Sequence, residues 1–115
     1  VRAFRRVSQV HRVYISSKNL TTIKRGAFSE CSGITKFNVV STKLNSMGKY
    51  ALYRTGKLKT VIFKTGYLTK SNVGSKAFSG IKSTATFTVP AGSVQNYKDL
   101  FKSKGAGSKF KVKSL

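Results

Sequence analysis

The chain has 115 residues, 39% of them hydrophobic and 11% aromatic, which is enough to build one packed domain and excludes a disordered basic tail. It contains 23 Lys and Arg residues but only two acidic residues, Glu30 and Asp99, so the formal net charge is +21. The single cysteine, Cys31, excludes an internal disulfide and a cysteine-based metal site, and no apolar run reaches the ~20 residues that span a bilayer.

Apolar residues recur along the chain at a step of 24 positions. The last unit has two extra residues between Leu68 and Val73, after which the register resumes at a step of 26. The clearest columns are Val13, Phe37 and Val61, then Ile15, Val39 and Phe63, then Leu20, Leu44 and Leu68, then Ala27 and Ala51. Such a period predicts a solenoid of stacked units, each of which buries its neighbour's apolar face.

The first unit is incomplete, because Ala3 and Phe4 occupy the columns that Ala27 and Phe28 occupy one unit later. The chain also opens without an initiator Met or a signal peptide, so we expect a mature product or an excised fragment. We therefore expect either missing upstream repeats in a longer protein or a second chain packed against the N-terminal end.

Each complete unit predicts one short strand followed by one short helical or 3₁₀ turn. The strand is indicated by alternating apolar residues, as in Val13-x-Ile15 and Phe87-x-Val89. The turn is indicated by Ala27, Phe28, Cys31 and Ile34, which share one face at helical spacing. Glycines flank these turns at Gly26, Gly48 and Gly74 and at Gly33, Gly56 and Gly80, where the backbone must turn sharply. Residues 1–90 are thus predicted to be an array with a parallel sheet on one face.

Residues 91–115 are predicted to cap the array. Pro90 ends the last strand, and Ser93 is placed to act as a helix N-cap. Helical spacing of Val94, Tyr97, Leu100 and Phe101 predicts an amphipathic helix over residues 93–103. After two glycines, Phe110 and Val112 alternate with lysines and predict a final edge strand, which the lysines protect from edge-to-edge pairing.

The segment from Leu20 to Val39, L-x-x-I-x-x-x-A-F-x-x-C-x-x-I-x-x-F-x-V, resembles the BspA-type leucine-rich repeat. The segment Thr86-Phe-Thr-Val-Pro-Ala-Gly-Ser-Val-Gln-Asn-Tyr-Lys resembles the closing part of such arrays in secreted proteins of gut Firmicutes. The resemblance covers nearly all of residues 3–101. It implies an α/β leucine-rich-repeat solenoid, often one module of a larger extracellular or cell-surface protein associated with adhesion.

A candidate ligand-binding face is formed by the outward residues of the predicted strands, because solenoids commonly bind on such broad, rigid surfaces. Tyr14, Asn38, Ile62 and Thr88 should form one row across the sheet, with basic residues on its flanks. The alternative is that these are ordinary exposed strand residues with good β-propensity. The predicted ligand-binding residues are Arg12, Tyr14, Lys36, Asn38, Ile62 and Lys64.

The basic charge predicts partners that carry negative charge, above all an anionic polysaccharide of a cell wall or host surface, or a surface protein. Nucleic acid is a further candidate partner, on the basis of the charge alone. The lysines are spread through all units, whereas a nucleic-acid reader concentrates Arg and aromatic residues on one groove. The alternative is a solubilising surface with no chosen partner.

No arrangement of residues indicates catalysis, a cofactor or a metal site. Cys31 lies in a core column and is expected to be buried, and His11 has no carboxylate nearby in sequence. Glu30 and Asp99 lie in different parts of the array and make a poor acid–base pair. We therefore predict a non-catalytic binding or adhesion module without membrane insertion. The alternatives are a structural spacer or cap of a larger surface protein, and a nucleic-acid-binding domain.

Overall fold

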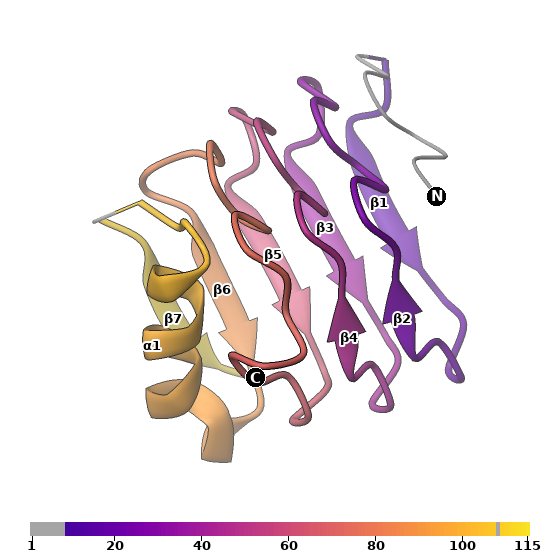
Figure 1. The fold of residues 1–115 in the computed structure, drawn as a ribbon, viewed down its shortest axis with the longest axis vertical. Helices are drawn as coiled ribbons and strands as arrows, with labels where there is room; N and C mark the ends of the chain where they lie inside the picture. Colours follow the sequence, from indigo (N-terminus) through magenta and orange to yellow (C-terminus); the bar gives the residue numbers. More distant parts are fainter. Residues whose placement is uncertain (1–8, 108) are drawn as a thin grey trace.

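The computed structural model describes residues 9–107 and 109–115, and it shows successive coils stacked side by side with a helix at one end (Figure 1). Each coil of the array runs along the sheet, turns, and returns on the opposite side. The elements in chain order are β1 (Arg12–Ile15), β2 (Thr22–Ile23), β3 (Lys36–Val39), β4 (Ser46–Met47), β5 (Thr60–Phe63), β6 (Thr86–Val89), η1 (Ala91–Ser93), α1 (Val94–Ser103) and β7 (Lys111–Ser114).

The main sheet has the order β1-β3-β5-β6-β7, and all its neighbouring strands are parallel. Its register follows the sequence repeat and confirms the predicted strands and the predicted columns. The inward residues of β3, β5 and β6 are fully buried, whereas their outward neighbours remain partly or largely exposed. One inward row across the whole sheet consists of Val13, Phe37, Val61, Phe87 and Val112.

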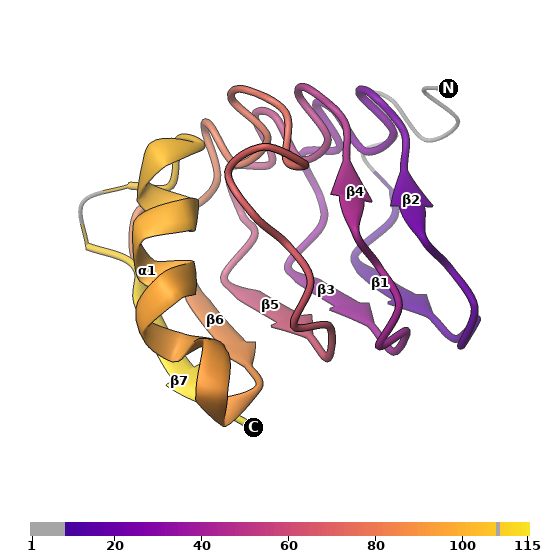
Figure 2. The same ribbon diagram turned by 60° about the horizontal axis from the view of Figure 1, so that its bottom comes forward.

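A second parallel ladder was not predicted from the sequence. β2 pairs with β4, and Met47 forms a further bridge to Val73, on the side of the coils opposite the main sheet (Figure 2). The predicted strand of each unit lies in the main sheet, and this second ladder is an addition to it that the sequence did not reveal, because two residues of alternation are too short to be distinguished from a loop.

The two extra residues of the last unit lie in the loop between this ladder and the main sheet. The side chain of Asn72 fastens that loop: its Oδ1 accepts a hydrogen bond from the Thr69 N–H at 2.7 Å, and its Nδ2 donates to the Tyr67 carbonyl at 2.9 Å. Val73 thereby reaches the same row as Met47 in spite of the longer step.

The predicted helical turns are runs of β-turns, and the helices within residues 9–107 and 109–115 are η1 and α1. The Ala27 and Ser29 N–H groups bond back three residues, to the carbonyls of Lys24 and Gly26. The alternate donors point to the next coil instead: Gly26 N–H reaches Lys49 O at 2.9 Å, and Phe28 N–H reaches Ala51 O at 3.0 Å. A helix cannot form there because every second donor is used between coils.

The turns also require left-handed backbone at two positions per coil. Glycine occupies some of these positions, but elsewhere a side chain is held at positive φ, at a cost of about 1 kcal/mol per residue. One row consists of Gly26 (φ 65°), Tyr50 (63°) and Lys76 (57°), and the other of Glu30 (60°), Arg54 (59°) and Gly80 (84°).

The core is filled by phenylalanine rings that contact one another from coil to coil. Phe28, Phe37 and Phe63 meet edge to face at centroid distances of 5.1 and 6.3 Å, and Phe87 stacks on Phe101 of α1 at 4.0 Å. Cys31 is fully buried, as predicted from its column. No Lys or Arg in the described ranges is buried, so the charge lies on the surface around a continuous apolar interior.

The predicted cap is present: α1 covers the end of the core, and β7 extends the sheet at its edge. The Tyr97 hydroxyl closes the last coil, since it donates to the Thr65 carbonyl at 2.7 Å and accepts from the Leu68 N–H at 3.2 Å. Ser93 is at the N-cap position of α1, but its side chain makes no capping hydrogen bond and interacts with Tyr97 instead.

Alkaline pH is expected to loosen the cap through Tyr97. Burial raises the pKa of its hydroxyl above the ordinary value of 10.0, against the smaller lowering effect of its hydrogen bonds. A raised folded-state pKa means that this contribution to stability is complete below about pH 10 and is lost as the pH rises through the folded-state pKa. In urea unfolding at a series of alkaline pH values, the free energy of unfolding of the unmodified protein should fall more steeply with pH than that of Tyr97→Phe. Lysine deprotonation affects both proteins equally and therefore cancels in this comparison. If the free energy of unfolding fell with the same slope against pH in both proteins, the expectation would be contradicted.

Candidate binding surface on the parallel sheet

The outward side chains of the main sheet form two rows that run across the strands. The first row pairs Arg12 with Lys36 and continues through Thr60. The second row is Tyr14, Asn38, Ile62 and Thr88, in the register that the repeat predicts. The structure thus brings five of the six predicted ligand-binding residues together on β1, β3 and β5, and places the sixth, Lys64, exposed directly after β5.

Tyr14 and Asn38 differ from ordinary strand residues in their surroundings. The Tyr14 side chain is 66% exposed, although it lies within a strand. Asn38 is next to it in the row, and its Oδ1 atom is buried without a hydrogen-bond partner among the described residues. An unsatisfied buried acceptor costs about 1–3 kcal/mol, so this oxygen is a free acceptor held beside an exposed ring.

Arg12 and Lys36 place like charges directly opposite each other on neighbouring strands, which lie about 4.8 Å apart. Such a pair is destabilising unless a counter-charge is present. Neither acid of the chain lies in a strand, because Glu30 is in a turn and Asp99 is in α1. The two cations therefore face solvent without a carboxylate from the sheet, and an external anion would relieve their repulsion.

A shallow groove runs beside these cations at the start of the strands, lined by Arg12, Thr35, Lys36, Lys59 and Thr60. Lys59 was missed in the sequence because it precedes the alternating residues of β5 and belongs to no predicted row. The groove adds a third cation to the Arg12–Lys36 pair and joins two coils.

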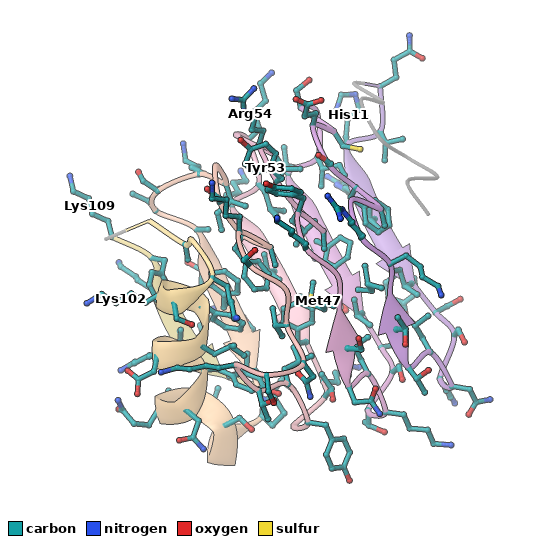
Figure 3. The ribbon with its side chains drawn as sticks, in the orientation of Figure 1. His11, Met47, Tyr53, Arg54, Lys102 and Lys109 are labelled. Carbon is teal, nitrogen blue, oxygen red and sulfur yellow. The ribbon has the colours of Figure 1, made fainter. Side chains whose placement is uncertain are left out.

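His11 has a structural position at the edge of this region (Figure 3). Its ring Nδ1 lies 3.3 Å from the Gly33 carbonyl, and its own carbonyl accepts from the Thr35 N–H at 2.7 Å. Within residues 9–107 and 109–115, no group of three or more His, Cys, Asp or Glu side chains is arranged to hold a metal ion.

A second group of polar side chains, on the turn side of the coils, was not predicted. Tyr50 and Tyr53 contact each other at a ring-centroid distance of 4.8 Å, and Arg25, Lys49 and Arg54 lie over their rings. The signal in the sequence is Tyr-x-x-Tyr-Arg in the second turn, together with a basic column at Arg25 and Lys49. It is recognisable only once the turn geometry is known.

Comparison with known families matches residues 1–114 to the family described as "BspA type Leucine rich repeat region", in six copies. The chain belongs to this family. The BspA-type repeat is generally a non-catalytic module, and it occurs in surface proteins. No curated protein and no solved structure was found to match the chain.

The match runs through the array and through most of the predicted cap, so both parts belong to the BspA-type repeat region. The predicted boundary at residue 90 falls between β6 and η1. No helix in the described part of the chain is long and apolar enough to cross a membrane.

Proposed function

We propose that this BspA-type module binds an anionic polysaccharide on the outward face of its main sheet, as a non-catalytic adhesion element of an extracellular or cell-surface protein. The observation that carries the proposal is the position of Arg12 and Lys36, two opposed cations, beside Tyr14 and the unpartnered oxygen of Asn38. The opposed cations and the unpartnered oxygen reduce stability, and Tyr14 exposes a large ring. A charged sugar carries anionic groups, an apolar ring face and hydroxyls that are complementary to these three features.

The chemistry of each group suits one part of such a ligand. The exposed Tyr14 ring offers an apolar surface to the C–H face of a sugar ring. A sugar hydroxyl would donate to Asn38 Oδ1 once the side chains that bury this oxygen move aside on binding. Carboxylate or sulfate groups on the polymer would approach Arg12, Lys36 and Lys59 along the groove. A flat, rigid sheet holds these groups in fixed positions, so little ordering is required on binding.

An acidic surface protein could use the same cations, and nucleic acid could use the charge alone. A module without any ligand would instead act as a spacer or cap within a larger surface protein. The tests that follow distinguish the sheet-face site from binding through charge alone, because only a defined site depends on Lys36 and Asn38 more than on an equivalent charge elsewhere.

The test is a binding titration with a heparin-like polysaccharide at about 150 mM salt, where purely Coulombic attraction is strongly screened. Lys36→Gln is expected to weaken binding about tenfold, as for the loss of one charge-assisted hydrogen bond. The matched control is Lys70→Gln, which removes the same charge from an exposed loop. Equal effects of the two variants would contradict the sheet-face site, and binding that disappears at this salt concentration would leave the module as a spacer with a generic basic surface.

Asn38→Thr separates binding from stability. It removes the unsatisfied Oδ1 and improves β-propensity, so we expect the free energy of unfolding to rise by about 1 kcal/mol. Binding of the polysaccharide should weaken at the same time. A variant that is more stable and binds equally well would show that Asn38 does not contact the ligand.

A further inference from the structure

The turn side of the coils carries a cluster of aromatic and basic residues that is separate from the sheet face; we name it the turn-side cluster, and it consists of Arg25, Lys49, Tyr50, Tyr53 and Arg54. Figure 3 shows Tyr53 and Arg54 on this side, away from the strands of the main sheet. The cluster spans two neighbouring turns. Backbone hydrogen bonds fix its members, since Tyr53 O accepts from Glu30 N–H at 2.6 Å and Arg54 N–H donates to Ser79 O at 2.8 Å.

The two rings organise the three cations around them. Arg25 Cζ and Lys49 Nζ lie 5.8 and 5.0 Å from the centre of the Tyr50 ring, and Arg54 Cζ lies 5.2 Å from the centre of the Tyr53 ring. Cation–π attraction holds each charge in place without neutralising it. The tyrosines therefore gather positive charge at one place and keep it available to a partner.

One carboxylate lies close to the cluster. The Glu30 Oε2 atom is 3.7 Å from Arg54 Nη1, while the other acid of the chain, Asp99, belongs to α1. Three cations thus face one carboxylate, and the Arg54 side chain remains 65% exposed. The cluster has a net positive charge, and its two guanidinium side chains, Arg25 and Arg54, are exposed to solvent.

The backbone indicates that these side chains are not needed for the turns themselves. Tyr50 and Arg54 both have positive φ, and each has a glycine at the equivalent position of one neighbouring coil (Gly26 and Gly80) and a residue with a side chain in the other (Lys76 and Glu30). Glycine would form the same turns with less strain.

We propose that the turn-side cluster is a second binding site, for the tetrahedral oxyanion of a sulfate or phosphate ester carried by a polymer. Guanidinium groups bind such oxyanions through paired N–H donors, and a tetrahedral group can accept bonds from several cations at once. A nucleobase fits less well, because it would have to displace the cations and the neighbouring ring from the tyrosine faces before it could stack.

The test uses Arg54→Gly, which removes one cation and also relieves the positive φ. Binding of a heparin-like sulfated polysaccharide and of a poly(glycerol phosphate) is measured by calorimetry at about 150 mM salt. We expect Arg54→Gly to weaken the binding of at least one of them about tenfold, and the polymer affected identifies the ester. Tyr50→Gly should weaken the same binding, since Arg25 and Lys49 lose the ring that holds them.

Lys76→Gly is the matched control, because Lys76 also has positive φ (57°) and loses the same charge, but it makes no ring contact with the cluster. Equal weakening by Lys76→Gly and Arg54→Gly would overturn the proposal in favour of charge alone. Tighter binding of single-stranded DNA than of either ester polymer, dependent on Tyr50, would overturn it in favour of base stacking. A melting temperature lowered strongly by Tyr50→Gly would show that the ring is structural.

The proposal does not rest on the sheet-face site, and the two can fail separately. Variants at Lys36 and Asn38 test the sheet, whereas variants at Arg54 and Tyr50 test the turn side. A polysaccharide whose binding is affected by the second pair and not by the first supports the turn-side cluster while contradicting the sheet-face proposal.

Discussion

Gly74→Ala is expected to destabilise the protein by about 3 kcal/mol or more, because the coils are too close there to admit any side chain. A Cβ atom at Gly74 would overlap the Lys49 nitrogen and lie 2.6 Å from its Cα, both of them backbone atoms that cannot rotate away. The Gly74 N–H also donates to the Met47 carbonyl at 2.7 Å, so separation of the coils would break this bond. Chemical unfolding followed by circular dichroism measures the loss.

Gly92→Ala provides the control for this prediction. A Cβ at Gly92 meets nothing within 4 Å, and the residue lies exposed in η1. Its free energy of unfolding should change by no more than about 0.5 kcal/mol. If both variants lost the same stability, the cause would be the general preference of these loops for glycine and not the close approach of the coils.

Phe101→Ala is expected to cost about 3–5 kcal/mol and to release the cap from the array. Phe101 is fully buried, and its ring contacts those of Phe63, Phe78 and Phe87 from the last two coils. It is thus the side chain of α1 that joins the helix to the aromatic interior. Removal should lower the midpoint of urea unfolding, and hydrogen exchange should show α1 and β7 opening before β3 and β5.

Two further variants test the reason for this loss. Phe101→Leu keeps most of the buried volume and should lose clearly less stability than the alanine variant. Tyr67→Ala removes an aromatic ring that is 64% exposed and should be nearly neutral. A large loss in the Tyr67 variant would mean that ring removal in general, and not burial at the cap, causes the effect.

The strands and their register could be predicted because a period of 24 residues places equivalent positions side by side in any stacked array. Tyr14 and Asn38 were therefore placed in one row correctly, and Phe101 was placed on the inner face of the cap helix. The burial of the Asn38 oxygen could not be predicted, because it depends on how closely neighbouring side chains in the row enclose it.

The turns were predicted less well because their hydrogen bonds connect different coils. Ala27, Phe28 and Cys31 have helical spacing, but the Phe28 N–H bonds to Ala51 in the next coil, which no local pattern reveals. The turn-side cluster was missed for the same reason. Tyr50 meets the cations of two turns from a backbone with positive φ, a conformation that residues other than glycine rarely adopt and that the sequence therefore does not suggest.

The loop fastened by Asn72 shows that the length of a coil can change without any change in the rows on either side of it. Val73 stays in line with Met47, and Phe87 stays in line with Val61, although this coil is two residues longer than its neighbours. This corner is consequently where foreign peptides could be grafted into the array. An epitope introduced between Lys70 and Ser71 would be displayed at an exposed edge while both faces of the solenoid kept their geometry.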